Sequence, residues 1–110
     1  MQTNDSNKCI QLDREFVCPG IVFVLPQDRK CSFPYSAYMW SEGTETEVTI
    51  HFHTHRVVIR GQHLEQVPDY LASQQVRWVK TAGRATGLLS NALNNSAPLV
   101  NEITVEKVDE

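Results

Sequence analysis

The stretch from residue 47 to residue 61 constrains the fold more than any other part of this chain. Its sequence, EVTIHFHTHRVVIRG, alternates apolar with polar residues and is rich in β-branched side chains. Successive side chains of a strand point to opposite faces of a sheet, so this alternation predicts strands with one apolar and one polar face. Two such runs joined by a short break predict a β-hairpin.

The alternation also restricts the register of the hairpin. A two-residue loop at residues 53–54 would pair Ile50 with Val57. A loop at residues 54–55 would instead pair Phe52 with Val57. Both keep apolar residues opposite one another, whereas a three-residue loop without a bulge would send one hydrophobic set to the polar face. We therefore predict a two-residue loop, or a longer one whose bulge restores the alternation.

The polar face of this hairpin contains a histidine-rich motif that resembles a metal site. His51 and His53 stand two residues apart, so they share a strand face, and imidazole binds zinc, copper, nickel or iron. The turn falls inside the HxHxH motif, however, and the predicted neighbours Arg56 and Arg60 repel a cation. We predict no metal site here, and a metal held by His51 and His53 is the alternative.

An anion is the other ligand that this face could hold. Arginine offers paired N–H donors that match a carboxylate or a phosphate. The candidate ligand-binding residues are Thr49, His51, His53, Arg56 and Arg60. The simplest interpretation is a solvated sheet face without a ligand, and it stays open whether residues 99–108 cover that face.

Length and composition limit the remaining possibilities. A chain of 110 residues predicts one domain, over residues 15–108, after a flexible lead-in over residues 1–14. The net charge of −3 gives no general attraction to nucleic acid or to an anionic membrane. No apolar run is long enough to span a bilayer. Three cysteines without CxxC spacing favour neither a disulfide framework nor a zinc site, so we expect a protein of the reducing cytoplasm.

The rest of the chain predicts a mixture of strands and one main helix. Leu64, Val67 and Leu71 have helical spacing, which predicts about three turns from near residue 63 to residue 75, with a regular start near Val67 because of Pro68. The other predicted elements are strands at 16–18, 21–25, 76–80 and 99–108, a bent strand at 31–40, a loop at 81–87 and a short helix at 88–93. In the strand at 76–80, Val76 and Trp78 are expected on one face. This order indicates an α+β fold, with a small curved antiparallel sheet or an open β-barrel or roll and one helix packed against it.

The sequence contains no recognisable catalytic motif, which shapes the functional prediction. None of the nucleophile-elbow, zinc-protease, calcium-loop or phosphate-loop patterns occurs. We therefore predict a non-enzymatic binding or assembly module that needs no cofactor. Its partner would be another protein or a second copy in a homodimer, met through the aromatic side chains of Tyr35, Tyr38 and Trp40. The alternative is a small-ligand site or enzyme on the polar face of residues 47–61, and nucleic-acid binding is not expected.

Overall fold

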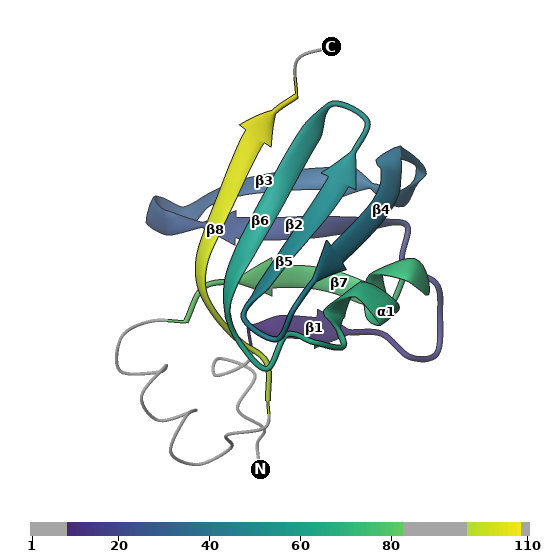
Figure 1. The fold of residues 1–110 in the computed structure, drawn as a ribbon. Coiled ribbons are helices and arrows are strands. Elements are labelled where there is room, and N and C mark those ends of the chain that lie inside the picture. The colour runs from purple at the N-terminus through teal and green to yellow at the C-terminus, as the bar shows by residue number, and fades with distance from the viewer. Residues whose placement is uncertain (1–8, 83–96, 109–110) are drawn as a thin grey trace.

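The computed structural model describes residues 9–82 and 97–108, which form two four-stranded β-sheets (Figure 1). The back sheet in Figure 1 has the order β1 (Ile10–Leu12), β7 (Val76–Lys80), β2 (Gly20–Leu25) and β3 (Arg29–Pro34). The front sheet has the order β4 (Tyr38–Gly43), β5 (Glu47–Phe52), β6 (His55–Gln62) and β8 (Leu99–Lys107). All neighbouring strands are antiparallel except β2 and β7, which are parallel. The helix predicted at 88–93, and most of the loop before it, lie outside the described residues.

Two sheets replace the single curved sheet or open barrel that the sequence suggests. The expected bent strand at 31–40 ends at Pro34, and a 3₁₀ turn, η3 (Tyr35–Ala37), carries the chain from β3 in the back sheet to β4 in the front sheet. Proline cannot donate a ladder hydrogen bond, so a strand ends readily there. A second 3₁₀ turn, η2 (Pro26–Asp28), joins β2 to β3. Figure 1 shows the strands of one sheet crossing those of the other at a steep angle.

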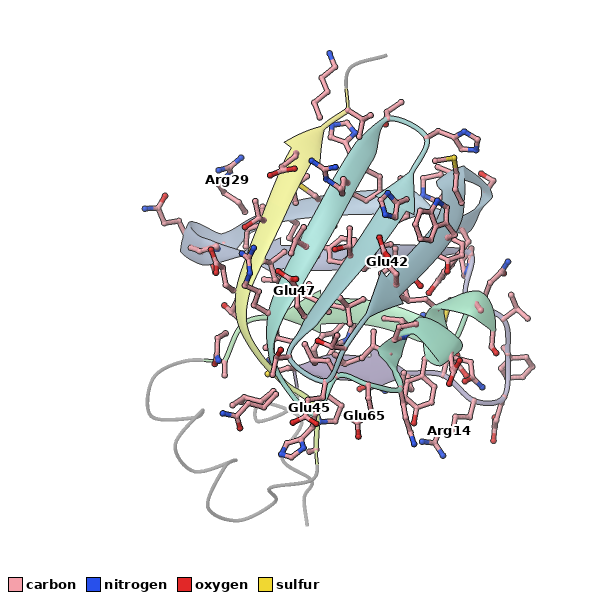
Figure 2. The ribbon with its side chains drawn as sticks, viewed as in Figure 1. Arg14, Arg29, Glu42, Glu45, Glu47 and Glu65 are labelled. Carbon is pink, nitrogen blue, oxygen red and sulfur yellow. The ribbon has the colours of Figure 1, made fainter. Side chains whose placement is uncertain are left out.

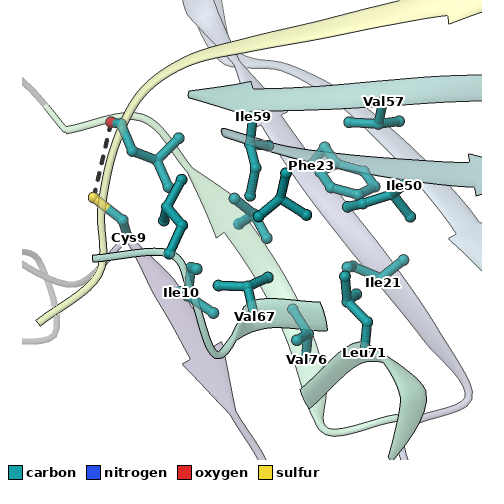
Figure 3. Close-up of a cluster of buried hydrophobic side chains, with 14 of the residues drawn as sticks. Cys9, Ile10, Ile21, Phe23, Ile50, Val57, Ile59, Val67, Leu71 and Val76 are labelled. Atoms are coloured by element: carbon teal, nitrogen blue, oxygen red, sulfur yellow. Dashed lines mark hydrogen bonds between the residues drawn. The ribbon is translucent and has the colours of Figure 1, made fainter. Parts of the chain in front are cut away.

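The hydrophobic core lies between the two sheets (Figure 3). Ile21 and Phe23 of β2 face Ile50 of β5, and Phe52 of β5 lies edge-on to Phe23. All four side chains are almost completely buried. The core also takes in Cys9 and β1, which precede the domain boundary predicted at residue 15. The packed part of the chain therefore includes residues that the sequence assigns to a flexible lead-in.

The β5–β6 hairpin forms with the first of the two expected registers. Ile50 pairs with Val57 and Val48 pairs with Ile59, so residues 53–54 form the loop between the strands. Val48, Ile50, Val57 and Ile59 are buried in the core. The prediction of a two-residue loop that keeps apolar residues opposite one another is confirmed.

The one α-helix in the described residues, α1 (Val67–Ala72), is shorter than predicted. It starts at Val67 as expected, with Pro68 in its first turn, and it buries Val67 and Leu71. The helix stops at Ala72 because Gln74 adopts a φ of 58°, in the left-handed region that ends helices. Within residues 9–82 and 97–108, no helix has the length and apolar character needed to cross a membrane. The strand expected at residues 16–18 does not form, and these residues lie in the loop from β1 to β2.

Candidate interaction surfaces

The outer face of the front sheet carries most of the residues that the sequence suggests for a ligand site. The register places its side chains in three rows that run across the strands. The first row is Trp40, His51, Arg56 and Glu106. The second is Glu42, Thr49, Val58 and Thr104, and the third is Glu47, Arg60 and Glu102. Strand β8 pairs with the edge of β6, so it extends this face and does not cover it.

Both arginines of this face form ion pairs with carboxylates of neighbouring strands. Arg56 donates two hydrogen bonds to one oxygen of Glu106, the shorter at 2.6 Å. Arg60 binds Glu47 at 2.8 Å and Glu102 at 3.4 Å. An anionic ligand would have to displace these carboxylates, and Figure 2 shows Glu42 and Glu47 on the same side of the sheet. The geometry therefore gives no support to the predicted anion site, which stays a prediction.

His51 is held against Trp40 and does not meet His53. The rings of Trp40 and His51 stack with centroids 4.1 Å apart. Only 20 % of the His51 side chain is exposed, and its Nε2 lies 3.5 Å from a Glu42 oxygen without a hydrogen bond. His53 lies exposed in the two-residue turn. Among the described residues, no three histidine, cysteine, aspartate or glutamate side chains converge as metal ligands would.

His55, the third histidine of the motif, lies on the inner side of the sheet, as the alternation of side chains along β6 requires. Its ring lies beside Phe33, with centroids 5.4 Å apart. Its Nδ1 shares a hydrogen bond of 2.7 Å with the hydroxyl of Thr54. His55 therefore points away from His51, and the turn divides the HxHxH motif between the two faces of the sheet.

Of the three aromatic residues expected at a contact surface, only Trp40 is widely exposed. Tyr35 is 5 % exposed, contrary to the prediction, and its hydroxyl donates a hydrogen bond of 2.7 Å to the Val76 carbonyl. Tyr38 is half-buried and its hydroxyl bonds with that of Ser41. Trp40 and its neighbour Met39 are each 49 % exposed. A bulge explains this, because Tyr38 pairs with Phe52 and Trp40 with His51, so Met39 is an extra residue in β4.

A second surface, which the sequence does not predict, lies on the outer face of the back sheet. A shallow groove of about 360 Å³ is lined by Val22, Val24, Lys30, Trp78 and Lys80. The ammonium group of Lys80 lies 5.1 Å from the centre of the Trp78 ring. The continuous apolar run of β2 is typical of a strand buried on both faces, yet Val22 and Val24 are only half-buried. We refer to these five residues as the Trp78 groove.

A bulge is also the reason why the position of Trp78 is wrongly predicted. Gln11 pairs with Trp78 but Leu12 pairs with Val76, so Arg77 is an extra residue in β7. Val76 and Val79 therefore both enter the core, while Trp78 points outward. The three-residue spacing of the two valines was the only local signal of this bulge. The parallel pairing that brings Trp78 next to Val22 joins distant parts of the chain.

Arg77 fastens the loop from β1 to β2 onto the back sheet. Its guanidinium binds Asp13 at 2.6 Å, and this bond, helped by the backbone N–H groups of Phe16 and Glu15, lowers the pKa of the Asp13 carboxyl below its ordinary value. Phe16 and Val17, next in the chain, are largely exposed. The loop thus presents two apolar side chains from a backbone that Asp13 holds in place.

Comparison with known proteins does not assign the chain to a family, since no family model, curated protein or solved structure matches it significantly.

Proposed function

We propose that this protein is a non-enzymatic protein-interaction module that contacts its partner through Met39 and Trp40. One observation carries the proposal: two large apolar side chains, each 49 % exposed, stand side by side on an ordered edge strand. Tryptophan and methionine are enriched at protein interfaces, and tryptophan often contributes most to binding. The partner is another protein or a second copy of this chain.

The local structure supports this role because it orients the two side chains before any partner arrives. The bulge turns both Met39 and Trp40 toward solvent, and the stacked ring of His51 supports one side of the indole. The backbone nearby is anchored as well, since the His53 N–H donates to the Ala37 carbonyl at 2.9 Å. A side chain that is already ordered loses less conformational entropy when it binds.

Site-specific photo-crosslinking tests this proposal. A photoreactive amino acid replaces Met39, and in a matched variant it replaces Glu102, which lies at the opposite edge of the same sheet. We expect the variant at position 39 to form a discrete adduct in cells, and Trp40→Ser in the same chain to reduce it at least about tenfold. Sedimentation velocity on the purified protein then shows whether the adduct is a homodimer. Equal adducts from positions 39 and 102, or an adduct unaffected by Trp40→Ser, would overturn the proposal.

The alternative function, a small-ligand site on the polar face of the hairpin, rests on Thr49, His51, His53, Arg56 and Arg60. Its arginines are already paired with carboxylates, and His51 and His53 do not converge with a third ligand in the described residues. No contact in the structure favours it over the interaction module. Thermal unfolding with zinc, phosphate and a chelator tests it directly, because a ligand at a hundred times its Kd adds about 2.7 kcal/mol to the free energy of unfolding.

A further inference from the structure

We infer that the Trp78 groove is a second docking surface, which takes an extended, acidic segment of a partner protein that also carries an apolar side chain. This surface lies on the back sheet, on the opposite side of the core from Met39 and Trp40. The inference therefore does not depend on the proposed function of those two residues. It rests on the arrangement of lysines and apolar residues in the groove, and on the contrast in charge between the two outer faces.

The register arranges the groove in two rows with different chemistry. In one row, Val24 lies between Lys80 of β7 and Lys30 of β3. In the next row, Val22 lies beside Trp78. Each row is separated from the next by two residues of a strand, which is roughly 6.6 Å. The groove therefore has a cationic end and an apolar end at a spacing that a strand sets.

An extended peptide has the same period as this groove. Its alternate side chains point the same way and repeat at roughly 6.6–6.8 Å. A peptide that runs along β2 would thus set a carboxylate above Val24, between the two lysines, and the side chain two residues away above Val22 and Trp78. An acidic residue, a spacer and an apolar residue form the pattern that fits.

The charges of the molecule direct an acidic segment to this face. Among the described residues, the groove is lined by Lys30 and Lys80 and by no carboxylate, and no ion pair joins either lysine to another of these residues. The contact with the Trp78 ring holds the Lys80 ammonium at the groove. The outer face of the front sheet has an excess of negative charge, since its rows contain four glutamates and two arginines. An acidic segment would be repelled there.

A protein segment suits this surface better than single-stranded nucleic acid does. Nucleic acid binding combines several phosphate contacts with aromatic rings on which successive bases stack. The groove has a single tryptophan, over which Lys80 already lies, and two lysines, in a chain of net charge −3. A short acidic segment needs only one carboxylate between the lysines and one apolar contact.

Chemical-shift mapping with synthetic peptides tests the inference. The probe is a blocked peptide Ser-Glu-Thr-Leu-Thr-Glu-Ser, and its matched control carries glutamine in place of both glutamates. We expect the acidic peptide to bind with a Kd on the order of 0.1–1 mM. The shifted backbone amides should be those of the Trp78 groove, together with the indole N–H of Trp78. The glutamine peptide should bind at least tenfold more weakly, and added salt should weaken the acidic peptide.

Charge reversal on each sheet provides the control in the protein. Lys30→Glu and Lys80→Glu should each weaken binding of the acidic peptide and together abolish it, while Lys107→Glu, a change of charge on exposed β8 equal to that of either single variant, should leave its affinity within twofold. Circular dichroism confirms that each variant is folded. Equal affinity for both peptides, shifts centred on Met39 and Trp40, no binding at millimolar peptide, or tighter binding of oligothymidylate would each overturn the inference. Failure here leaves the crosslinking result at Met39 unaffected, so the two proposals can be judged separately.

Discussion

At the scale of single residues, Tyr35 links the two sheets where the chain passes between them. Its backbone N–H donates to the Pro19 carbonyl at 2.9 Å, and its hydroxyl donates to the Val76 carbonyl at 2.7 Å. The ring is buried and lies edge-on to Tyr38, with centroids 6.1 Å apart. Its sequence context, an aromatic after a proline, is equally typical of an exposed residue, which is why its burial could not be predicted.

Tyr35→Phe should lower the free energy of unfolding by about 1–2 kcal/mol, because the buried Val76 carbonyl loses its donor while the ring keeps its packing. Urea denaturation near neutral pH measures the change. The matched control is Tyr70→Phe, which removes a hydroxyl that donates to Gln66 at an exposed position. This variant should lower the free energy of unfolding by less than about 0.5 kcal/mol. Equal losses in both variants would contradict this role of Tyr35.

The burial of Tyr35 predicts that the stability of the folded protein depends on pH. Burial raises the pKa of the Tyr35 hydroxyl above its ordinary value, and burial also raises that of the Cys9 thiol. At alkaline pH the unfolded chain releases these protons while the folded chain keeps them, so the stability should fall as pH rises through about 9 to 11. Tyr35→Phe should make this decline less steep, and urea midpoints across that range show whether it does.

At the scale of elements, alternation predicts strands well until a bulge interrupts it. The hairpin of β5 and β6 has no extra residue, and its register follows from parity alone. Met39 in β4 and Arg77 in β7 are extra residues, so the sheet faces of Met39, Trp40 and Trp78 could not be read from the sequence. The predicted polar face of the hairpin is thus correct, while the Trp78 groove was not foreseen.

A third bulge, between β6 and β8, depends on Gly61. Arg60 pairs with Glu102 but Gly61 pairs with Val100, so β8 contains an extra residue here. A Cβ at Gly61 would lie 1.7 Å from the Leu99 carbonyl oxygen, which is backbone and cannot turn away. Gly61→Ala should therefore force the strands apart and cost roughly 1–3 kcal/mol of stability.

Urea denaturation of Gly61→Ala checks this expectation, with Gln62→Ala as the control at the exposed neighbouring position. Hydrogen exchange of the β8 amides should also become faster in Gly61→Ala, because this bulge lies within the pairing of β6 with β8. A loss below about 0.5 kcal/mol with unchanged exchange would show that the bulge tolerates a side chain.

At the scale of the whole molecule, the pairing of distant strands decides the fold. β7 joins β1 on one side and β2 on the other, and the parallel contact with β2 spans more than fifty residues of chain. Local periodicity contains no information about such partners, so the sequence predicts strands and one main helix in an α+β domain far better than it predicts the division of the strands into two sheets. The Trp78 groove also depends on this long-range pairing, because Lys30 and Lys80 come to lie on either side of Val24 only when β2 pairs with both β3 and β7.

Because the core is shared between the sheets, they should unfold together. Phe33 of the back sheet stacks on Phe52 of the front sheet with centroids 4.2 Å apart, and Phe23 meets Phe52 edge-on at 6.2 Å. A sheet that lost its opposite layer would expose this whole apolar face, so neither sheet can remain folded alone.

The two tryptophans allow the unfolding of each sheet to be followed separately, because Trp40 lies in the front sheet and Trp78 in the back sheet. Trp40→Phe leaves Trp78 as the probe and Trp78→Phe leaves Trp40, and in each variant we expect the tryptophan emission and the far-ultraviolet circular dichroism to share one urea midpoint. Emission that changes before the circular dichroism in either variant would show that one sheet opens first, and that the contact between Phe33 and Phe52 does not couple them.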